Sequence, residues 1–175
     1  MMIKNEVILV DAQDNPIGSM EKLEAHQKGC LHRGFSVIIK NTKGQYLLQK
    51  RAHSKYHSPG LWTNSCSSHP SPGEETIQAA IRRLNEEMGI KKISLRPLFS
   101  FIYHIEFENS LSEHEFDHVL IGTYNNDIQT NSEEVEEFLW MYPEEINEWV
   151  TLNPEKFTYW FKLILSKMSF NKLFD

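Results

Sequence analysis

Cysteine is scarce in this sequence, which has two among 175 residues, Cys30 and Cys66. Small secreted domains rely on several disulfides, so this pair predicts reduced thiols and a cytoplasmic protein. Long hydrophobic runs are also missing. The apolar run at residues 7–10 is shorter than the core of a signal peptide, and no run approaches the roughly 18 residues of a membrane span. The sequence therefore predicts no membrane partner.

Positive charge is in deficit, with 18 Lys and Arg against 24 Asp and Glu and a formal net charge of -6. Proteins that bind nucleic acid along its backbone carry the opposite excess, so we expect no nucleic-acid partner. An anionic substrate would need a local group of basic side chains. The composition is otherwise that of a globular protein, with 40% hydrophobic and 24% charged residues.

Repeats, low-complexity tracts and linkers are absent, which predicts a single domain over residues 1–175. A chain of this length buries about two-thirds of its unfolded surface, so it needs no second copy to fold and we expect a monomer. Residue patterns predict strands at 7–10, 35–40, 46–49, 61–64, 98–107, 116–124 and 138–141, and helices at 20–27, 75–88, 144–149 and 154–168. Residues 41–44 indicate a hairpin turn. Strands mixed with helices indicate an α/β or α+β sandwich.

The clearest helix is predicted at residues 75–88, where apolar side chains recur with the spacing of one buried stripe. Another face carries Arg82 with Glu86 and Arg83 with Glu87, each pair four residues apart. Such pairs are typical of a solvated surface. Two acids at the C-terminal end of a helix oppose the helix dipole, however, which favours a cation that holds them there.

In register, this helix and its flanking loops resemble the Nudix box, a loop–helix–loop that binds divalent metal and a diphosphate. The matching residues are Ser68, Glu74, Arg82-Arg83, Leu84, Glu86-Glu87 and Gly89-Ile90. Ser68 replaces a glycine of the family pattern, and Arg83 replaces a glutamate that hydrolytic members use to gather metal. The resemblance implies an α/β fold, a Nudix-type α/β/α sandwich with a mixed sheet. The Arg83 change makes a plain Nudix hydrolase the weaker interpretation.

Residues 64–70 resemble the Asn-x-x-Cys-(Gly/Ser)-His-Pro segment of type I isopentenyl-diphosphate isomerases, and Glu113-His114-Glu115 resembles their paired-glutamate segment. The likeness extends in order to His26, Leu31-His32-Arg33, Arg51-Ala52, Ser54-Lys55, Pro59-Gly60, Tyr103 and Trp160. It implies an enzyme that moves the double bond of isopentenyl diphosphate to give its allylic isomer, dimethylallyl diphosphate. A small isoprenoid diphosphate is then the expected partner.

By this resemblance, a metal centre would be formed by His26, His32, His69, Glu113 and Glu115. The mixed nitrogen and oxygen donors suit zinc, manganese or magnesium. Glu113 and Glu115 are two residues apart, so on a strand both point to one face. The remaining histidines match nothing in the family, and we expect them to be structural or surface residues: His53, His57, His104, His114 and His118.

The same resemblance implies that Lys22, Arg51, Lys55 and Arg83 hold the diphosphate. An acidic protein needs such a concentration of positive charge, and arginine can bind phosphate oxygens through two nitrogens. Glu87 would bind a Mg²⁺ ion that bridges to the diphosphate. Without the resemblance, these bases would be interpreted as ordinary surface charges.

The family's reaction adds a proton to an unactivated alkene and removes another from a neighbouring carbon, through a tertiary carbocation. It needs an acid, a base and a site that excludes water. The resemblance makes Glu115, assisted by Tyr103, one proton-transfer group. It also places Trp160 against the hydrocarbon, where the face of its ring would stabilise the cation.

The second proton-transfer group of the family is a cysteine, and its position here holds Ser67. Cys66 is one place earlier, and neighbouring side chains of an extended chain point to opposite faces. Three outcomes stay open: Ser67 supports the isomerisation, a local bulge brings Cys66 to the site, or the site runs another reaction. We favour the first, because the other positions match. The alternatives to an isomerase are a hydrolase of a small diphosphate and an attenuated diphosphate-binding homologue.

Overall fold

The structure of the protein is a computed structural model that describes residues 5–168. Its elements are β1 (Glu6–Val10), β2 (Pro16–Glu21), α1 (Lys22–Lys28), β3 (His32–Lys40), β4 (Tyr46–Arg51), β5 (Trp62–Thr63), β6 (Cys66–Ser68), α2 (Thr76–Met88), β7 (Leu95–Glu106), β8 (Ser112–Thr123), β9 (Val135–Met141), α3 (Pro143–Leu152), η1 (Pro154–Lys156) and α4 (Tyr159–Lys167). The ends of the predicted domain, residues 1–4 and 169–175, lie outside the described part. Among the helices described, none has the length and apolar character to span a membrane.

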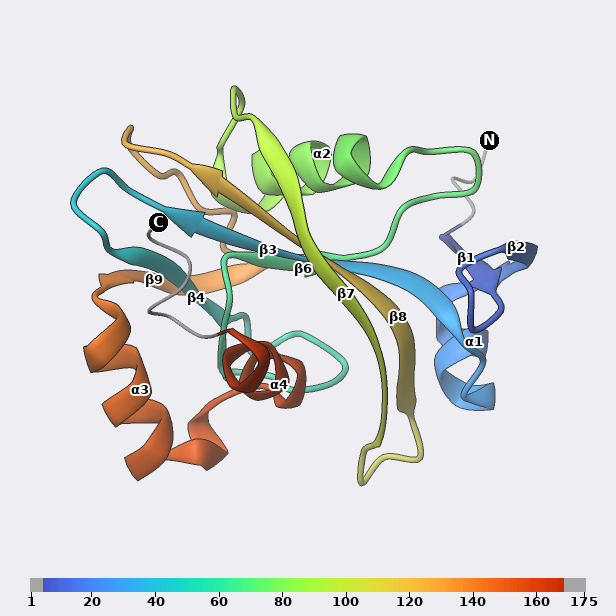
Figure 1. Ribbon diagram of the computed structural model, residues 1–175. Coiled ribbons are helices and arrows are strands. Elements are labelled where there is room, and N and C mark those ends of the chain that lie inside the picture. Colours follow the sequence, from blue (N-terminus) through green and yellow to red (C-terminus); the bar gives the residue numbers. More distant parts are fainter. Residues whose placement is uncertain (1–4, 169–175) are drawn as a thin grey trace.

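Strand β3 lies at the centre of one mixed sheet (Figure 1). Strand β8 runs parallel to it, from the pair His32–Glu115 to the pair Lys40–Thr123, and β7 pairs antiparallel with β8. Strands β6 and β1 also pair with β3, while β4 pairs with β5 and β9. The combination of a parallel pair with antiparallel ladders confirms the predicted mixed sheet.

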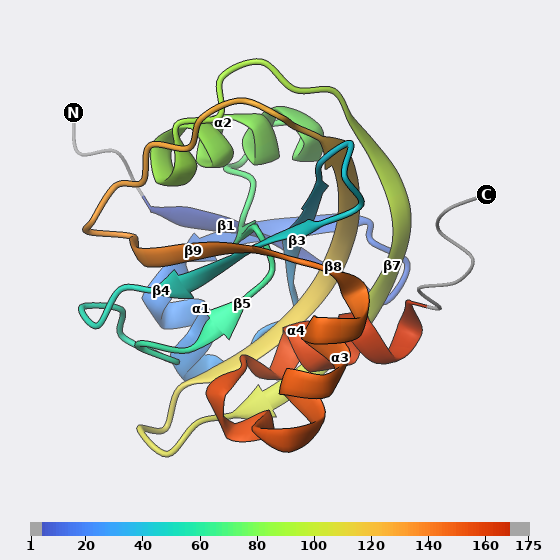
Figure 2. The same ribbon diagram turned by 90° about the vertical axis from the view of Figure 1, so that its left-hand side faces the viewer.

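The sheet is covered on both sides, as Figure 2 shows, with α2 on one side and α3 and α4 on the other. Each side has its own apolar core. Helix α2 packs through Leu84 and Met88 against Phe35 and Ile39 of β3. On the opposite side, Ile146 of α3 and Phe161 of α4 belong to a second core. These layers confirm the predicted α/β/α sandwich.

The predicted apolar stripe of α2 is buried, and Leu84 at its middle has no exposed surface. We expect Leu84→Ala to lower the free energy of unfolding by about 3 kcal/mol, because it leaves a cavity between α2 and the sheet. Urea denaturation followed by circular dichroism measures this change. The matched control is Leu152→Ala, since Leu152 is 69% exposed at the end of α3. Equal destabilisation by both substitutions would contradict the expected packing of α2.

The single helix predicted at residues 154–168 is wrong. The chain makes the short turn η1, becomes extended at Phe157 and Thr158, and only then begins α4. Phe157 forms an isolated parallel bridge with Trp62, and the Thr158 amide donates to the Trp62 carbonyl at 3.0 Å. The Thr158 hydroxyl also hydrogen-bonds that of Thr63 at 2.8 Å. Pairing with β5 therefore interrupts the helical pattern, and it anchors the segment that carries Trp160.

Two strands and one strand pairing also differ from the sequence prediction. Residues 41–44 form the expected turn, but β3 and β4 pair at Lys40–Tyr46 alone, because β3 pairs along its length with β8 and over part of it with β6. The short strands β2 and β6 were not predicted. Since β2 continues to Glu21, helix α1 begins later than predicted, and the Glu21 carboxylate caps it through the Glu24 amide.

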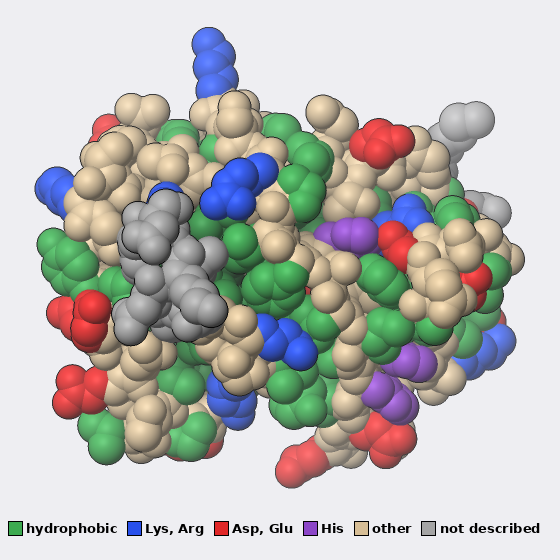
Figure 3. Space-filling view, viewed as in Figure 1, with side chains coloured by type: hydrophobic (Ala, Val, Ile, Leu, Met, Phe, Trp, Pro, Cys, Tyr) green, Lys and Arg blue, Asp and Glu red, His purple; other side chains and the backbone are tan. Residues whose placement is uncertain are grey.

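The surface seen in Figure 3 carries basic, acidic and apolar side chains that are interspersed. Lys and Arg side chains are spread over this face and form no broad basic patch on it. The positive charge that could hold an anion is instead gathered with acids and histidines inside a pocket.

Candidate active site

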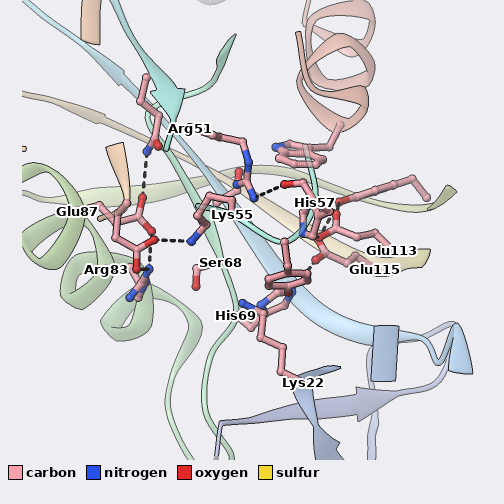
Figure 4. A pocket seen from close by; sticks show the side chains of 16 residues that line it. Lys22, Arg51, Lys55, His57, Ser68, His69, Arg83, Glu87, Glu113 and Glu115 are labelled. Atoms are coloured by element: carbon pink, nitrogen blue, oxygen red, sulfur yellow. Dashed lines mark hydrogen bonds and ion pairs between the residues drawn. The ribbon is translucent and has the colours of Figure 1, made fainter. Parts of the chain in front are cut away.

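One pocket collects side chains from motifs that are far apart in the sequence (Figure 4). It has an empty volume of about 520 Å³ and is lined by Lys22, Gln49, Arg51, Lys55, Tyr56, His57, Ser67, Ser68, His69, Arg83, Glu87, Tyr103, Glu113, Glu115, Glu134 and Trp160. Every predicted site residue is in this lining except His26 and His32. These two histidines are fully buried and contact the lining residues Glu113 and Glu115. The fold thus brings all the predicted site residues together.

The histidine–glutamate centre, which comprises His26, His32, His69, Glu113 and Glu115, is assembled from four segments. His26 lies on α1, His32 opens β3, His69 follows β6, and both glutamates lie on β8. The parallel register places His32 opposite Glu115. Glu113 and Glu115 face the same way because side chains alternate along a strand. The sheet therefore sets the spacing of this centre.

Donor atoms converge closely within this centre. Nε2 of His69 lies 2.6 Å from Oε1 of Glu115 and 3.2 Å from Nε2 of His32. Nε2 of His26 lies 3.5 Å from Oε1 of Glu113. One ligand atom each from the three histidines and Glu115 lie within 4.8 Å of one another. Nitrogen and oxygen donors at this spacing can hold a divalent metal ion.

Backbone carbonyls orient two of the imidazole rings. Nδ1 of His26 donates to the Lys22 carbonyl at 2.6 Å, and Nδ1 of His32 donates to the Cys30 carbonyl at 2.8 Å. In the neutral rings the proton is thereby fixed on Nδ1, and the lone pair of Nε2 is directed at the centre. Nε2 of His26 is fully buried without a hydrogen-bond partner. A buried nitrogen left in this way fits a metal ion as its missing partner.

The charges of the centre also suit a metal ion. Burial and the charge of Glu113 act to raise the pKa of Glu115, but the neighbouring histidines outweigh them and lower it to about 2. Burial likewise opposes ionisation of Glu113, yet His57 and His26 hold the pKa of that carboxyl well below its usual range. Burial lowers the pKa of His69 to about 4. Ionised carboxylates and a neutral His69 imidazole are the protonation states that metal binding requires of these groups.

Tyr103 and Gly34 complete the surroundings of the two glutamates. The Tyr103 hydroxyl donates to Oε2 of Glu113 at 2.6 Å and lies 3.1 Å from Oε2 of Glu115. Burial and the two carboxylates raise the pKa of Tyr103 well above its ordinary value, so this hydroxyl keeps its proton. Gly34 leaves room for Glu115, because a Cβ at this position would lie 2.5 Å from Oε2. Sequence analysis had not singled out Gly34.

Basic side chains gather at the other end of the pocket, around Arg83 (Figure 4). Nη2 of Arg83 lies 2.7 Å from Glu87 and 3.1 Å from Glu134, and Nζ of Lys55 lies 2.5 Å from Glu134. Gln49 donates to Glu87 at 3.0 Å. Burial acts against the charge of Arg83, but Glu87 and Glu134 together raise the pKa of the guanidinium. Sequence analysis missed Gln49 and Glu134, which orient the predicted residues.

Arg51 and Lys22 extend this basic group towards the histidine–glutamate centre. The guanidinium carbon of Arg51 lies 5.3 Å from the ring of Trp160, and its Nη2 donates to the His57 carbonyl at 3.1 Å. Lys22 is held over the ring of Tyr56 at 5.5 Å. Burial, and then the charge of nearby bases, lower the pKa of Lys22. An anion in the pocket would relieve this repulsion between cations.

Ser67 and Cys66 point to different faces of β6. Ser67 lines the pocket, and its Oγ lies 3.0 Å from Nδ2 of Asn64 and 3.1 Å from Oγ of Ser36. Ser36 donates in turn to the buried carboxyl of Asp117 at 2.8 Å. Cys66 is fully buried in the core under α2, where burial raises the pKa of its thiol. Since β6 pairs in regular register with β3, the alternative in which a bulge brings Cys66 to the site is wrong.

His57 lies in the pocket, although sequence analysis did not place it among the site residues. It was expected to be structural or on the surface, but it lines the pocket and its Nε2 lies 3.0 Å from Oε1 of Glu113. The available signal was its place two residues after Lys55, in the loop that follows Arg51. The remaining histidines are outside the described pocket lining, as predicted: His53, His104, His114 and His118.

Comparisons with known proteins show the family to which the chain belongs. Residues 31–161 match the NUDIX domain family. A Pectobacterium atrosepticum protein named isopentenyl-diphosphate Delta-isomerase is 53% identical over 133 residues, which cover 76% of this chain and 74% of the relative. A Photorhabdus laumondii protein named isopentenyl-diphosphate Delta-isomerase 2 is 52% identical over 135 residues, with 77% and 76% covered.

Solved structures support the fold. A Deinococcus radiodurans crystal structure superposes with a TM-score of 0.69 at 21% identity, and covers 84% of this chain and 89% of its own. The MutT protein from Methanosarcina mazei superposes with a TM-score of 0.62 at 21% identity, with 82% and 94% covered. At these identities the likeness concerns the fold alone.

Proposed function

This chain belongs to the Nudix family and, within it, to the isopentenyl-diphosphate Delta-isomerases, and we propose on this basis that it interconverts isopentenyl diphosphate and dimethylallyl diphosphate. One observation carries the proposal: the histidine–glutamate centre and the basic group open into the same pocket, beside Trp160. A short prenyl diphosphate needs this combination, because it has two phosphates at one end and a small hydrocarbon at the other.

The basic group would bind the diphosphate through Lys22, Arg51, Lys55 and Arg83. Their positive charge is local, in a chain whose formal net charge is -6. Glu134 holds Lys55 and Arg83 near one another in the structure, which supports a shared anionic ligand. Arginine and lysine together can contact several phosphate oxygens, and the two arginines can do so through paired nitrogens.

Two metal positions follow from the donors. His26, His32, His69, Glu113 and Glu115 would hold Mn²⁺, Zn²⁺ or Mg²⁺, because imidazole and carboxylate donors suit these ions. Glu87 would hold Mg²⁺ together with the diphosphate, because hard oxygen donors and phosphates are the usual Mg²⁺ ligands. When bound, these ions supply positive charge that orients the carboxylates and neutralises the diphosphate.

The reaction moves one proton in and one proton out. A proton is added to the terminal carbon of the alkene, a tertiary carbocation forms, and a proton leaves the neighbouring methylene to give the allylic isomer. Glu115, hydrogen-bonded by Tyr103, is one proton-transfer group, and Ser67 is the other. The ring of Trp160 is 2% exposed and faces the pocket, where it would stabilise the cation and exclude water.

Proton NMR of isopentenyl diphosphate with the purified protein in D₂O tests the function. Mg²⁺ is present in all samples, and Mn²⁺ or Zn²⁺ is added to some. We expect the allylic isomer to form and to carry deuterium, because each turnover exchanges a proton with the solvent. A parallel assay measures released phosphate and pyrophosphate. Release without isomer formation would contradict the isomerase and favour the hydrolase, and tight binding without either product would favour the attenuated homologue.

We also propose that the enzyme acts as a monomer in the cytoplasm. The fold of a single chain brings all the predicted site residues together, so the proposed chemistry calls for no residue from a second copy. Cys30 and Cys66 are unpaired in the structure, which supports a reducing compartment.

A further inference from the structure

The described residues contain a second group of metal donors that overlaps the histidine–glutamate centre. Ligand atoms of His26, His57 and Glu113 lie within 4.8 Å of one another, and all three residues are buried. The first group, His26, His32, His69 and Glu115, shares only His26 with it. His57 is therefore a donor beyond the residues that the isomerase resemblance assigns to metal.

Packing holds the His57 ring with Nε2 towards this centre. The ring stacks on Phe107, with centroids 5.0 Å apart and planes 10° from parallel. Tyr56 and Trp160 meet it edge-on at 4.8 Å and 5.8 Å. The His57 carbonyl accepts a hydrogen bond from Arg51. The ring is contacted by the neighbouring Tyr56 and by two distant residues, Phe107 and Trp160, so packing fixes the direction of Nε2.

The unshared electron pairs of the group formed by His26, His57 and Glu113 favour a cation as their partner. Tyr103 donates to Oε2 of Glu113, so Oε1 is the oxygen that faces His57 and His26, at 3.0 Å and 3.5 Å. Nε2 of His26 is fully buried and has no hydrogen-bond partner. A divalent ion near Oε1 would give this nitrogen the partner that it lacks.

We propose that His57 is an additional ligand of the metal ion in the histidine–glutamate centre. One ion is the simpler arrangement, because His26 uses Nδ1 for the Lys22 carbonyl and has only Nε2 to offer. The proposal rests on the metal centre of the proposed function, and it is independent of whether the bound substrate is isomerised.

A fourth imidazole changes which metal the centre prefers. Imidazole nitrogen favours Zn²⁺ and related transition metals, whereas Mg²⁺ prefers carboxylate oxygens and water. With His57 as a ligand, the centre has four nitrogen donors, from His26, His32, His57 and His69. We therefore expect it to select Zn²⁺ over Mg²⁺ more strongly than the same centre without His57.

Long-range ¹H–¹⁵N NMR of histidine rings during a Zn²⁺ titration of the metal-free protein tests this assignment. Nitrogen bound to zinc changes its chemical shift, so the number of shifting rings counts the imidazole ligands. We expect four rings to shift in the unmodified protein and three in His57→Gln. Competition with a chelating dye should give a Zn²⁺ Kd at least roughly 10-fold weaker for His57→Gln. The matched control, His53→Gln, changes an exposed histidine of the same loop and should alter neither result.

The count separates a ligand from a residue that only orients Glu113. If three rings shift in the unmodified protein and the His57 resonance stays in place, His57 is not a ligand, even where His57→Gln weakens Zn²⁺ binding. Failure to bind Zn²⁺ would also overturn the proposal. Because the count is made first on the unmodified protein, it holds even if His57→Gln fails to fold. Isomer formation in a sample with three shifting rings would retain the isomerase and reject this inference alone.

Discussion

Glu115→Gln is expected to lower kcat for isomerisation by on the order of 10³-fold or more. The Glu115 carboxylate contacts His69 at 2.6 Å and Tyr103 at 3.1 Å in the buried part of the pocket. An amide of the same shape neither accepts nor releases a proton at neutral pH, so the proposed transfer stops. The rate of isomer formation by NMR measures the effect at saturating isopentenyl diphosphate.

Controls separate this loss from unfolding and from loss of metal. Glu137→Gln makes the same change at an exposed position of β9 and should leave kcat unchanged. Circular dichroism and the metal content of Glu115→Gln show whether the fold and the centre persist. Tyr103→Phe keeps both carboxylates but removes the hydroxyl that donates to Glu113, and we expect a smaller loss of about 10- to 100-fold. Glu115→Gln activity within about 10-fold of the unmodified protein would exclude Glu115 as a proton-transfer group.

The parts of this site that could be predicted are those fixed by local periodicity or by motif. Glu113 and Glu115 share a face because they alternate on β8, and Arg83 and Glu87 meet because they are one helical turn apart on α2. His32 opens β3, which begins three residues before the predicted strand at residues 35–40. The layers of the fold followed from the resemblance to the Nudix box, which describes a whole structure and not one element.

The parts that could not be predicted depend on contacts between distant segments. His57 points into the pocket because Phe107 and Trp160 hold its ring, and neither lies near it in the sequence. Phe157 and Thr158, between η1 and α4, are extended because they pair with β5. The helical pattern of the sequence does not indicate that pairing. Strand β6 has three residues, too few for a periodicity, and exists through its register with β3.

Substitutions at Ser67 are expected to act in opposite directions. Ser67→Ala should lower kcat by about 10²-fold, because it removes the hydroxyl of the second proton-transfer group. Ser67→Cys should raise kcat above that of the unmodified protein. A thiol has an ordinary pKa near 8.5 and exchanges a proton with the hydrocarbon more easily than a serine hydroxyl does. The NMR assay with saturating isopentenyl diphosphate measures both variants.

The hydrogen bonds of Ser67 explain how a serine hydroxyl could act as the second proton-transfer group. Its Oγ lies within hydrogen-bond distance of Asn64 and of Ser36, and the Ser36 hydroxyl donates a hydrogen bond to Asp117. Since the Ser36 hydrogen is used in that bond, the Ser36 oxygen can only accept from Ser67, and Oδ1 of Asn64, at 3.2 Å, is a second acceptor for the Ser67 hydrogen. The Ser67 oxygen is thus held in position by Asn64 and Ser36, which lowers the cost of placing it against the substrate. Burial, with the charge of Glu115, raises the pKa of Asp117. The series of hydrogen bonds from Ser67 through Ser36 therefore ends in a carboxyl that holds its proton readily.

Cys66→Ala is the matched control for the thiol, and it distinguishes the possible outcomes. Cys66 is buried under α2 with a raised pKa, so its loss should change stability and leave kcat unchanged. Unchanged kcat in Ser67→Ala would exclude Ser67 as a proton-transfer group. If the unmodified protein binds isopentenyl diphosphate without turnover and Ser67→Cys restores it, the site is that of an attenuated homologue. Activity that falls in Ser67→Ala, persists in Cys66→Ala and rises in Ser67→Cys would identify a serine isomerase. In such an enzyme the Ser67 hydroxyl replaces the cysteine thiol of the family as a proton-transfer group.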